Sequence, residues 1–157
     1  MAHLIFDQGT GLAAWAAAKL PYVGPQGFGP CAAIGAASGP LLSDQLLAVI
    51  VYHDYLPGIG TMQCSLVATS PKWATPGTIQ AFLFYPFQQA GVRKLWVAIV
   101  HTNERAIRFG RGLGFKREAT LRQHFSPRHH AVIMSMLAEE YQASRWFVPP
   151  LAERKAA

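Results

Sequence analysis

The sequence predicts an α/β fold with a mixed, mostly antiparallel central sheet flanked by helices. Apolar segments at 31–38, 45–55 and 61–69 follow one another with only turn residues between them, which favours antiparallel pairing. The segments 61–69 and 92–101 are each followed by a helical segment, and such a connection makes the next strand parallel. We therefore expect a strand, a helix, three strands, a helix, a strand, a helix and two closing strands.

The composition predicts one globular domain covering residues 1–157. Of these residues, 51% are hydrophobic and 14% are charged, which argues against intrinsic disorder. No apolar run is long enough to span a bilayer and the start lacks signal-peptide features, so we expect a cytoplasmic protein. Cys31 and Cys64 lie in apolar segments and are expected as buried free thiols rather than a disulfide. His, Cys and acidic residues do not cluster at metal-ligand spacing, so no metal is expected.

The formal net charge is +6, and the basic excess is concentrated in the second half of the chain. Such a charge favours anionic partners, among them nucleic acid and polyphosphate-bearing small molecules. A solvated basic face that keeps the protein soluble explains it equally well, and both interpretations stay open. The residues concerned are Arg93, Lys94, Arg105, Arg108, Arg111, Lys116, Arg117, Arg122 and Arg128.

In the first half of the chain, residues 4–10 predict a short strand, and Thr10 is expected to cap a helix through 11–20 that Pro21 ends. Residues 21–30 are rich in Gly and Pro and predict a loop, and turns are expected at 38–44 and 57–60. Segment 61–69 alternates in polarity. Its apolar face would carry Met62, Cys64, Leu66 and Ala68, and its partly polar face Gln63, Ser65, Val67 and Thr69.

In the second half, residues 78–91 predict a helix, which Pro86 should kink or end because proline lacks the N–H that the helix needs. A buried strand at 92–101 precedes a helix at 102–114, for which Gly114 is the expected left-handed cap. Ala106, Phe109 and Leu113 would line one side of that helix. Segments 115–125 and 130–141 predict two strands joined by a turn at 126–128.

This order, together with "GVRKLWVAIVHTNERAIRFGRGLGFKREATLRQHF", resembles the GNAT superfamily of acetyl-coenzyme A-dependent N-acyltransferases. Asn103, Ala106 and Gly114–Phe115 are similar to the Asn-x-x-Ala…Gly-Phe signature of that superfamily. The closing hairpin is similar to that of its ribosomal-protein and small-amine acetyltransferase branches, and the resemblance covers about residues 45 to 141. It implies a sheet whose two middle parallel strands splay apart.

The resemblance implies that coenzyme A lies in this wedge, between 61–69 and 92–100. The pantetheine arm would bond to the backbone of Leu66, Val67 and Ala68, and Asn103 would both cap its helix and contact the cofactor arm. The pyrophosphate would sit at the start of the helix that follows 61–69. Free N–H groups and the helix dipole favour a bound anion there.

The loop "PKWATPGTI" matches the family's pyrophosphate loop only in part. Trp73 and Gly77 match, whereas Ala74, Pro76 and Ile79 depart from the family's Arg/Gln-x-x-Gly-x-Gly/Ala pattern. We expect the hydroxyls of Thr75 and Thr78 to compensate. The alternative is a plain helix-starting turn with proline in its first turn.

The residues expected to perform catalysis are His53, Gln63, Ser65 and Tyr85. The family's general-acid tyrosine corresponds to Gly110 here, so another group must protonate the leaving thiolate. In "YHDY", alternation would put Tyr52 and Asp54 on one face and His53 and Tyr55 on the other, which would bring His53 or Tyr55 to the wedge mouth. The alternatives are a solvated hairpin end for His53 and helix packing for Tyr85. His101, which ends the second splayed strand, is a weaker candidate.

The resemblance implies an acetyl-coenzyme A-dependent N-acyltransferase that acts on an amine of a small molecule or protein. Short divergent members are associated with bacteriophages, and two alternatives stay open: a Mom-type DNA-modification protein and a GNAT-like module without catalysis. The acceptor pocket would form from residues 21–31 and the closing hairpin. The sequence names no acceptor, leaves nucleic acid as an alternative partner, and leaves open whether the chain forms a homodimer, as these folds often do.

Overall fold

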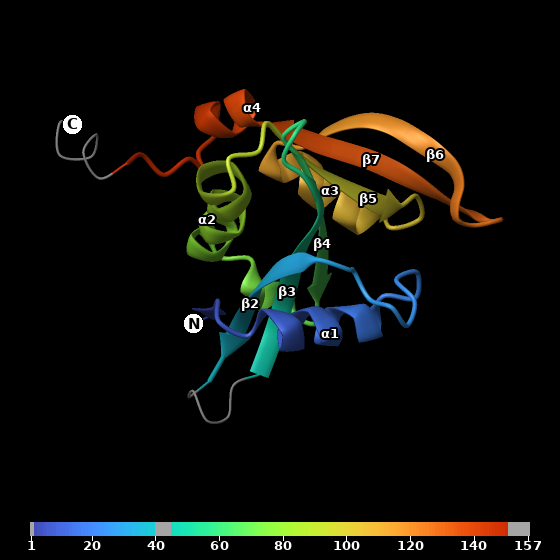
Figure 1. The fold of residues 1–157 in the computed structure, drawn as a ribbon, viewed down its shortest axis with the longest axis horizontal. Coiled ribbons are helices and arrows are strands. Elements are labelled where there is room, and N and C mark those ends of the chain that lie inside the picture. Colours follow the sequence, from blue (N-terminus) through green and yellow to red (C-terminus); the bar gives the residue numbers. More distant parts are fainter. Residues whose placement is uncertain (1, 40–44, 151–157) are drawn as a thin grey trace.

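The computed structural model describes residues 2–39 and 45–150. Their strands form one seven-stranded sheet in the order β1-β2-β3-β4-β5-β7-β6 (Figure 1). The strands are β1 (His3–Ile5), β2 (Cys31–Ser38), β3 (Gln45–Leu56), β4 (Thr61–Ala68), β5 (Lys94–Val100), β6 (Lys116–Ser126) and β7 (His129–Leu137). The helices are α1 (Gly9–Lys19), α2 (Pro76–Phe84), α3 (Glu104–Leu113) and α4 (Ala138–Ala143), with a 3₁₀ turn η2 (Pro71–Trp73) and a π-helical turn η3 (Tyr85–Gln89). The predicted mixed α/β class is confirmed.

The pair β4–β5 is parallel, and the other neighbouring pairs in the sheet are antiparallel. The parallel ladder is short: it joins Thr61, Met62 and Gln63 to Lys94, Leu95 and Trp96. By contrast, β5 pairs with β7 over its whole length, from Lys94 to Val100. The sheet therefore consists of two well-paired halves, β1–β4 and β5–β7, that are joined over three residues and diverge beyond them.

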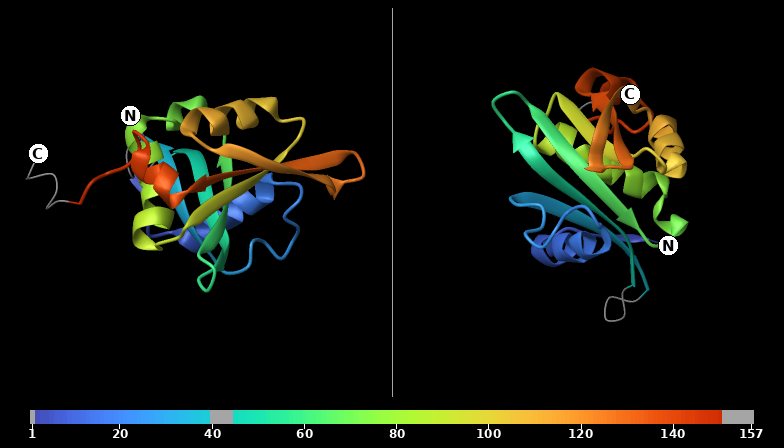
Figure 2. Two further views of the ribbon diagram at one scale, coloured as in Figure 1. Left: turned by 90° about the horizontal axis from the view of Figure 1, so that it is seen from above. Right: turned by 90° about the vertical axis from the view of Figure 1, so that its right-hand side faces the viewer.

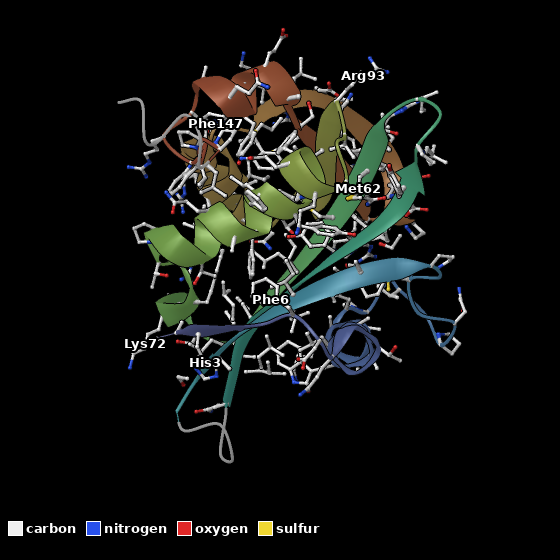
Figure 3. The ribbon with its side chains drawn as sticks, turned by 60° about the vertical axis from the view of Figure 1, so that its left-hand side comes forward. His3, Phe6, Met62, Lys72, Arg93 and Phe147 are labelled. Atoms are coloured by element: carbon white, nitrogen blue, oxygen red, sulfur yellow. The ribbon has the colours of Figure 1, made fainter. Side chains whose placement is uncertain are left out.

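The two faces of the sheet carry separate cores. Helix α1 covers one face, where Leu12 and Ala16 pack with Val49 and Val51, and α2, α3 and α4 cover the other (Figure 2). On that second face the larger core includes Tyr52, Met62, Phe82, Leu95 and Met134. Figure 3 labels Met62 on β4, with Arg93 near one end of this strand and Lys72 beyond the other. Alternate residues of β3 and β4 thus face different layers, as strand geometry requires.

The helix that follows β4 changes its hydrogen-bonding pattern where proline was expected to disrupt it. Helix α2 ends at Phe84, and η3 continues as a π-helical turn in which the N–H of Ala90 donates to the carbonyl of Tyr85 at 2.9 Å. Proline has no N–H to donate to the preceding turn, so the wider turn accommodates it. The predicted irregularity at Pro86 is confirmed.

Three expectations about local structure are wrong. Thr10 does not cap α1, because the helix begins at Gly9 and the N–H of Leu12 donates to the Gln8 carbonyl. The last strand ends at Leu137, because the Glu140 carboxylate accepts from the Leu137 N–H and starts α4. Cys31 is exposed at the start of β2, although Cys64 is buried and both thiols are free. Part of the turn expected at 38–44 lies outside the described residues.

Within residues 2–39 and 45–150, no helix combines the length and the apolar character that crossing a membrane requires.

Candidate active site

A cavity of about 590 Å³ lies where β4 and β5 diverge. Because the ladder ends at Gln63 and Trp96, alternate backbone N–H and C=O groups of β4 beyond that point face the gap without a strand partner. The volume is in the range of small-molecule sites. The lining comes from both strands, the α1–β2 loop, α2, α3 and β6, and it includes His53, Gln63, Ser65, Leu66, Trp73 and Asn103.

Three side chains at the end of β3 and on β4 form a hydrogen-bonded row beside the cavity. The Nδ1 atom of His53 lies 2.6 Å from Oδ2 of Asp54, and its Nε2 atom lies 2.8 Å from Oγ of Ser65. An ionised carboxylate can only accept, so Nδ1 carries the ring proton and donates to Asp54. Nε2 is then left to accept the hydroxyl proton of Ser65. The arrangement couples a hydroxyl to a base and the base to a carboxylate that orients it.

The backbone of Asp54 leaves strand geometry to complete this row. Its φ is +49°, in the left-handed region that costs a residue other than glycine about 1 kcal/mol or more. The β3–β4 ladder is irregular from His53 to Leu56, which includes this position. Simple alternation would have put Tyr52 and Asp54 on one face, and that prediction is wrong. The irregularity brings the Asp54 carboxylate to His53, whereas the hydroxyl of Tyr52 donates to the Phe82 carbonyl in the other layer.

His53 is enclosed although its carboxylate partner is open to solvent. The histidine is 7% exposed and its ring centroid lies 5.0 Å from that of Phe28, whereas the Asp54 side chain is 63% exposed. The exposed carboxylate retains its hydration and so needs no further partner. The row therefore joins an exposed carboxylate, a buried imidazole and a hydroxyl, and all three residues border the cavity.

The strand expected to hold a pantetheine arm borders the cavity through Leu66. The side chain of Val67 packs in the layer of α1, and Ala68 is exposed near the end of β4. Backbone hydrogen bonds to an extended ligand do not depend on these side chains, and only the backbone groups that face β5 are available for them. The geometry is that of a strand with one free edge over residues 64–68.

The turn before α2 is held by its own threonines. Thr75 is the N-cap and its Oγ1 accepts from the Thr78 N–H at 3.3 Å, while the two hydroxyls lie 2.9 Å apart. Thr78 is buried, so its hydroxyl serves the cap rather than a surface ligand. Gly77 is exposed, and a Cβ atom placed on it would meet no heavy atom within 4 Å. Of the three residues expected to hold a pyrophosphate, Gly77 presents the most open backbone.

Trp73 connects this turn to both helices beside the cavity. Its ring stacks on Phe82 of α2 with centroids 5.5 Å apart and meets Phe109 of α3 edge-on at 5.4 Å. Trp73 is buried and borders the cavity. It acts as a wall of the site and as the packing link between η2, α2 and α3.

Asn103 is the N-cap of α3, and its Oδ1 accepts from the Ala106 N–H at 3.2 Å. It also borders the cavity, as do Ala106, Phe109 and Leu113 of the same helix. Gly114 ends the helix with φ of +111°, so the predicted left-handed cap is confirmed. At Gly110, a Cβ atom would lie 3.3 Å from the sulfur of Met134. The space next to the position of the family's tyrosine is thus occupied by a β7 side chain.

Aromatic side chains line the end of the cavity nearest the α1–β2 loop. Tyr22 packs on Phe125 of β6 with centroids 4.6 Å apart, and Phe28 packs on His53. Among the lining residues that the structure describes, Asp54 is the single carboxylate and no lysine or arginine occurs. Residues of the 21–31 segment and of the closing hairpin therefore line one pocket, as expected, and its walls there are apolar and aromatic.

Several expected residues are not brought to the cavity. Tyr85 packs against Tyr52 in a tilted arrangement with ring centroids 4.7 Å apart, and Tyr55 donates to the Ala90 carbonyl at 3.3 Å. The Nδ1 atom of His101 accepts from the N–H of His130. None of these three belongs to the described cavity lining, whereas His53, Gln63 and Ser65 all do.

The sequence interpretation missed Asp54 as a partner of His53, because it relied on strict strand alternation. The adjacency of a histidine and an aspartate at a strand end was the available signal, since aspartate tolerates the left-handed region better than most residues. The segments of Tyr22, Phe28 and Phe125 were expected to form the acceptor pocket, but the contact between Tyr22 and Phe125 and that between Phe28 and His53 were not foreseen.

The titration properties of two buried core groups next to the site follow from their surroundings. Burial raises the pKa of the Cys64 thiol to about 12. Burial, with the nearby Cys64 and Tyr85, also raises the pKa of Tyr52. Both groups stay neutral at physiological pH, which is consistent with structural roles. Among the described residues, no group of three His, Cys, Asp or Glu is placed to hold a metal ion.

Comparison with known proteins gives structural matches without sequence matches. No family model and no curated protein matches the sequence. A spermidine N-acetyltransferase SpeG chimera from Vibrio cholerae and hSSAT is similar with a TM-score of 0.69 and 13% identity, over 89% of this chain and 98% of that chain. The dodecameric V. cholerae spermidine N-acetyltransferase aligns with a TM-score of 0.62 and 14% identity, over 72% and 68% of the two chains.

A T. thermophilus protein assigned as an acetyltransferase aligns with a TM-score of 0.61 and 20% identity, over 73% of this chain and 63% of that chain. These identities are too low to carry a substrate from one protein to another. The three structures nevertheless align with this chain over 72% to 89% of its length, with TM-scores of 0.61 to 0.69. The chain has the GNAT acetyltransferase fold.

Proposed function

We propose that this protein is an acetyl-coenzyme A-dependent N-acyltransferase. The observation that carries the proposal is the separation of β4 from β5 beyond Gln63 and Trp96, which leaves a free strand edge along a cavity. A thioester donor whose arm is extended and rich in amide groups suits such an edge, because each amide can replace a missing ladder bond.

The residues around the wedge are compatible with coenzyme A as the donor substrate. The free edge at Leu66 to Ala68 would take the pantetheine arm, and Trp73 and Asn103 border its path. The open backbone at Gly77, at the start of α2, would face the pyrophosphate, with Thr75 and Thr78 holding the turn in shape. Lys72, exposed in η2, and the exposed arginines of α3 supply positive charge near this end.

The acceptor side favours an amine on an apolar or aromatic body. Tyr22, Phe28 and Phe125 offer ring surfaces, and the single lining carboxylate, Asp54, is already paired with His53. A polyamine carries several positive charges that would need carboxylate partners in such a pocket. The acceptor amine would lose its proton to His53 directly or through Ser65, while Gln63 orients it.

Donor binding is tested by thermal unfolding of the purified chain with acetyl-coenzyme A. A ligand at 100 times its Kd stabilises a protein by about 2.7 kcal/mol, which gives a measurable rise in Tm. Asn103→Ala should reduce the rise. Inorganic tripolyphosphate, which carries comparable charge without the nucleotide or the pantetheine arm, serves as a control for mere polyanion binding to this basic protein. An unchanged Tm at saturating acetyl-coenzyme A contradicts the proposal.

An amino group of a nucleobase is the second candidate acceptor. Exposed basic side chains follow β6, which forms a hairpin with β7 that extends beyond the other strands (Figure 2), and His124 and Phe125 of β6 also line the cavity. These residues are Lys116, Arg117, Arg122 and Arg128. A base turned out of a duplex could stack on the aromatic end of the pocket. Duplex binding that weakens steeply with salt supports this acceptor, and its absence at low salt excludes it.

A further inference from the structure

We propose that Ser65 is a covalent nucleophile that receives the acyl group before the acceptor does, with His53 as its base and acid. This inference rests on the proposed function for its donor and goes beyond it in assigning an acyl-enzyme intermediate. It starts from the unbroken row Asp54, His53 and Ser65, whose two contacts measure 2.6 and 2.8 Å.

The direction of the hydrogen bonds makes Ser65 the reacting end. The Nδ1–H of His53 donates a hydrogen bond to Asp54, so the free electron pair of Nε2 points at the Ser65 hydroxyl. Both ring nitrogens are engaged, and an acceptor amine that reaches His53 directly must displace Ser65. Ser65 borders the cavity together with His53, so the hydroxyl and its base both face the space where the donor would bind.

The first half-reaction is balanced within this row. The Ser65 Oγ–C bond forms on the thioester carbonyl carbon while the hydroxyl proton passes to His53 Nε2. The C–S bond then breaks, and the same proton passes from Nε2 to the sulfur, which leaves as the free thiol. His53 thereby supplies the acid that a tyrosine supplies elsewhere in the family. The position of that tyrosine is Gly110 here, and the neighbouring Met134 has no proton to give.

In the second half-reaction a neutral amine forms the N–C bond with the acyl carbon and gives its proton to His53 Nε2. The C–O bond to Ser65 breaks, and this proton returns to Oγ. Asp54 accepts the hydrogen bond from Nδ1–H throughout, and no proton is transferred to it. Free N–H groups on the β4 edge can polarise the carbonyl oxygen in both halves.

The strained backbone of Asp54 is consistent with a catalytic role for the row. Asp54 adopts its left-handed backbone conformation at the point where its carboxylate meets the imidazole. Such conformations persist where the surrounding structure requires them, and they concentrate at functional sites. A hydroxyl that only needed a hydrogen-bond partner would not require an oriented imidazole with its own carboxylate.

The test is rapid acid quenching of the full-length protein after mixing with acetyl-coenzyme A without an acceptor, followed by intact-mass and peptide mass spectrometry. We expect one added acetyl group on Ser65, with an equal amount of free coenzyme A measured by chromatography. Cys31→Ser serves as the background, because the exposed Cys31 thiol can exchange with thioesters. Ser65→Ala and His53→Gln should abolish the adduct.

Ser126→Ala is the matched control. Ser126 and His129 form a second serine–histidine contact, at 2.6 Å, outside the described cavity lining, and the variant should label like the parent. Thermal unfolding confirms that each variant is folded. Ser65→Cys keeps a nucleophile at the position and should retain a labile acyl adduct.

A fluorophosphonate probe, which needs no coenzyme A, separates this inference from the proposed function. If acetyl-coenzyme A raises Tm but no acetyl-Ser65 forms on rapid quenching, the inference is overturned and the proposed function stands. If acetyl-coenzyme A does not bind but the probe labels Ser65 in a His53-dependent way, the donor assignment fails and the activated serine stands. If Ser65 carries no acetyl adduct and is not labelled by the probe, the inference is overturned whatever the donor is.

Discussion

The indole ring of Trp73 stacks on Phe82 with centroids 5.5 Å apart and planes inclined by 18°. Through its contact with Phe109 the same ring joins the turn before α2 to α3. The ring thus packs between α2 and α3, the helices whose N-caps are Thr75 and Asn103. Packing and site geometry depend on one side chain here.

Replacing Trp73 by Ala should lower the free energy of unfolding by about 3 to 5 kcal/mol, the usual effect of removing a buried large aromatic side chain. Trp73→Phe should cost less, because it keeps a stacked ring. Urea denaturation measures both values. Equal stability of the Ala variant and the parent would show that the stack contributes nothing to the fold.

Gly77→Ala should weaken the binding of acetyl-coenzyme A without lowering the stability of the fold. No heavy atom lies within 4 Å of the added Cβ, and Gly77 is not among the glycines with positive φ, so the variant should fold at least as well as the parent. If the backbone at Gly77 lies against a pyrophosphate, acetyl-coenzyme A should bind about tenfold more weakly. Isothermal titration measures the affinity. Gly112→Ala, at an exposed position of α3, is the control. Unchanged affinity would place the phosphates elsewhere.

Asp54→Gly should move stability and activity in opposite directions. Glycine relieves the left-handed strain, so unfolding should become more costly by up to about 1 kcal/mol. Loss of the carboxylate should lower kcat by about tenfold or more, because His53 loses its orienting partner. Gln123→Gly, at the other described residue with positive φ that is not glycine, provides the stability effect alone. If both variants gain stability and neither loses kcat, Asp54 has no role in catalysis.

Phe28→Ala should affect the acceptor more than the donor. Phe28 packs on the His53 ring and lines the end of the cavity away from α2. We expect KM for the acceptor to rise severalfold while the Kd of acetyl-coenzyme A stays within twofold. Steady-state kinetics and titration provide the two values. Equal effects on both substrates would mean that the aromatic end belongs to one shared subsite.

The alkaline limit of stability should depend on Cys64. Its pKa of about 12 in the folded protein lies above the ordinary value of 9.0, because burial disfavours the thiolate. The folded state therefore keeps its full stability below about pH 9 and loses it as the pH rises toward 12, and the difference corresponds to at most about 4 kcal/mol. Tyr52 should add to this loss, since its pKa is also raised.

Urea denaturation between pH 8 and 11 tests this dependence. Cys64→Ala should flatten the alkaline loss only in part, because Tyr52 remains. The free thiols supply an independent check: Cys31 should react with iodoacetamide in the native state and Cys64 only after unfolding. Rapid native labelling of Cys64 would contradict its burial.

The fold was predictable from sequence because local signals and chain order agreed. Asn103 and Gly114 mark the two ends of α3 by chemistry that depends on neighbouring residues alone. The end of β7 was missed although Ala138, Glu139 and Glu140 favour a helix, because the apolar strand was extended through them to Tyr141. The helix begins where Glu140 caps Leu137, a local signal, and Tyr141 packs on Phe87, a tertiary contact.

The strands that carry the site could be predicted, but the contacts between its side chains could not. His53 was expected from the polar cluster at a strand end, and Gln63 and Ser65 from the polar face of segment 61–69 together with the family resemblance. All three line the cavity. The bond between His53 and Asp54 depends on a backbone conformation that alternation cannot anticipate. The meeting of Tyr22 with Phe125 joins segments about a hundred residues apart, which no local pattern encodes.

The short ladder between β4 and β5 also bears on motion. The two halves of the sheet share three residue pairs at one end, while each half is paired along the length of its strands. A small rotation about Gln63 and Trp96 changes the width of the wedge without breaking a bond inside either half. The same joint that creates the opening is therefore where strand pairing restrains the two halves least, and a donor that bonds to both diverging strands would tie them together.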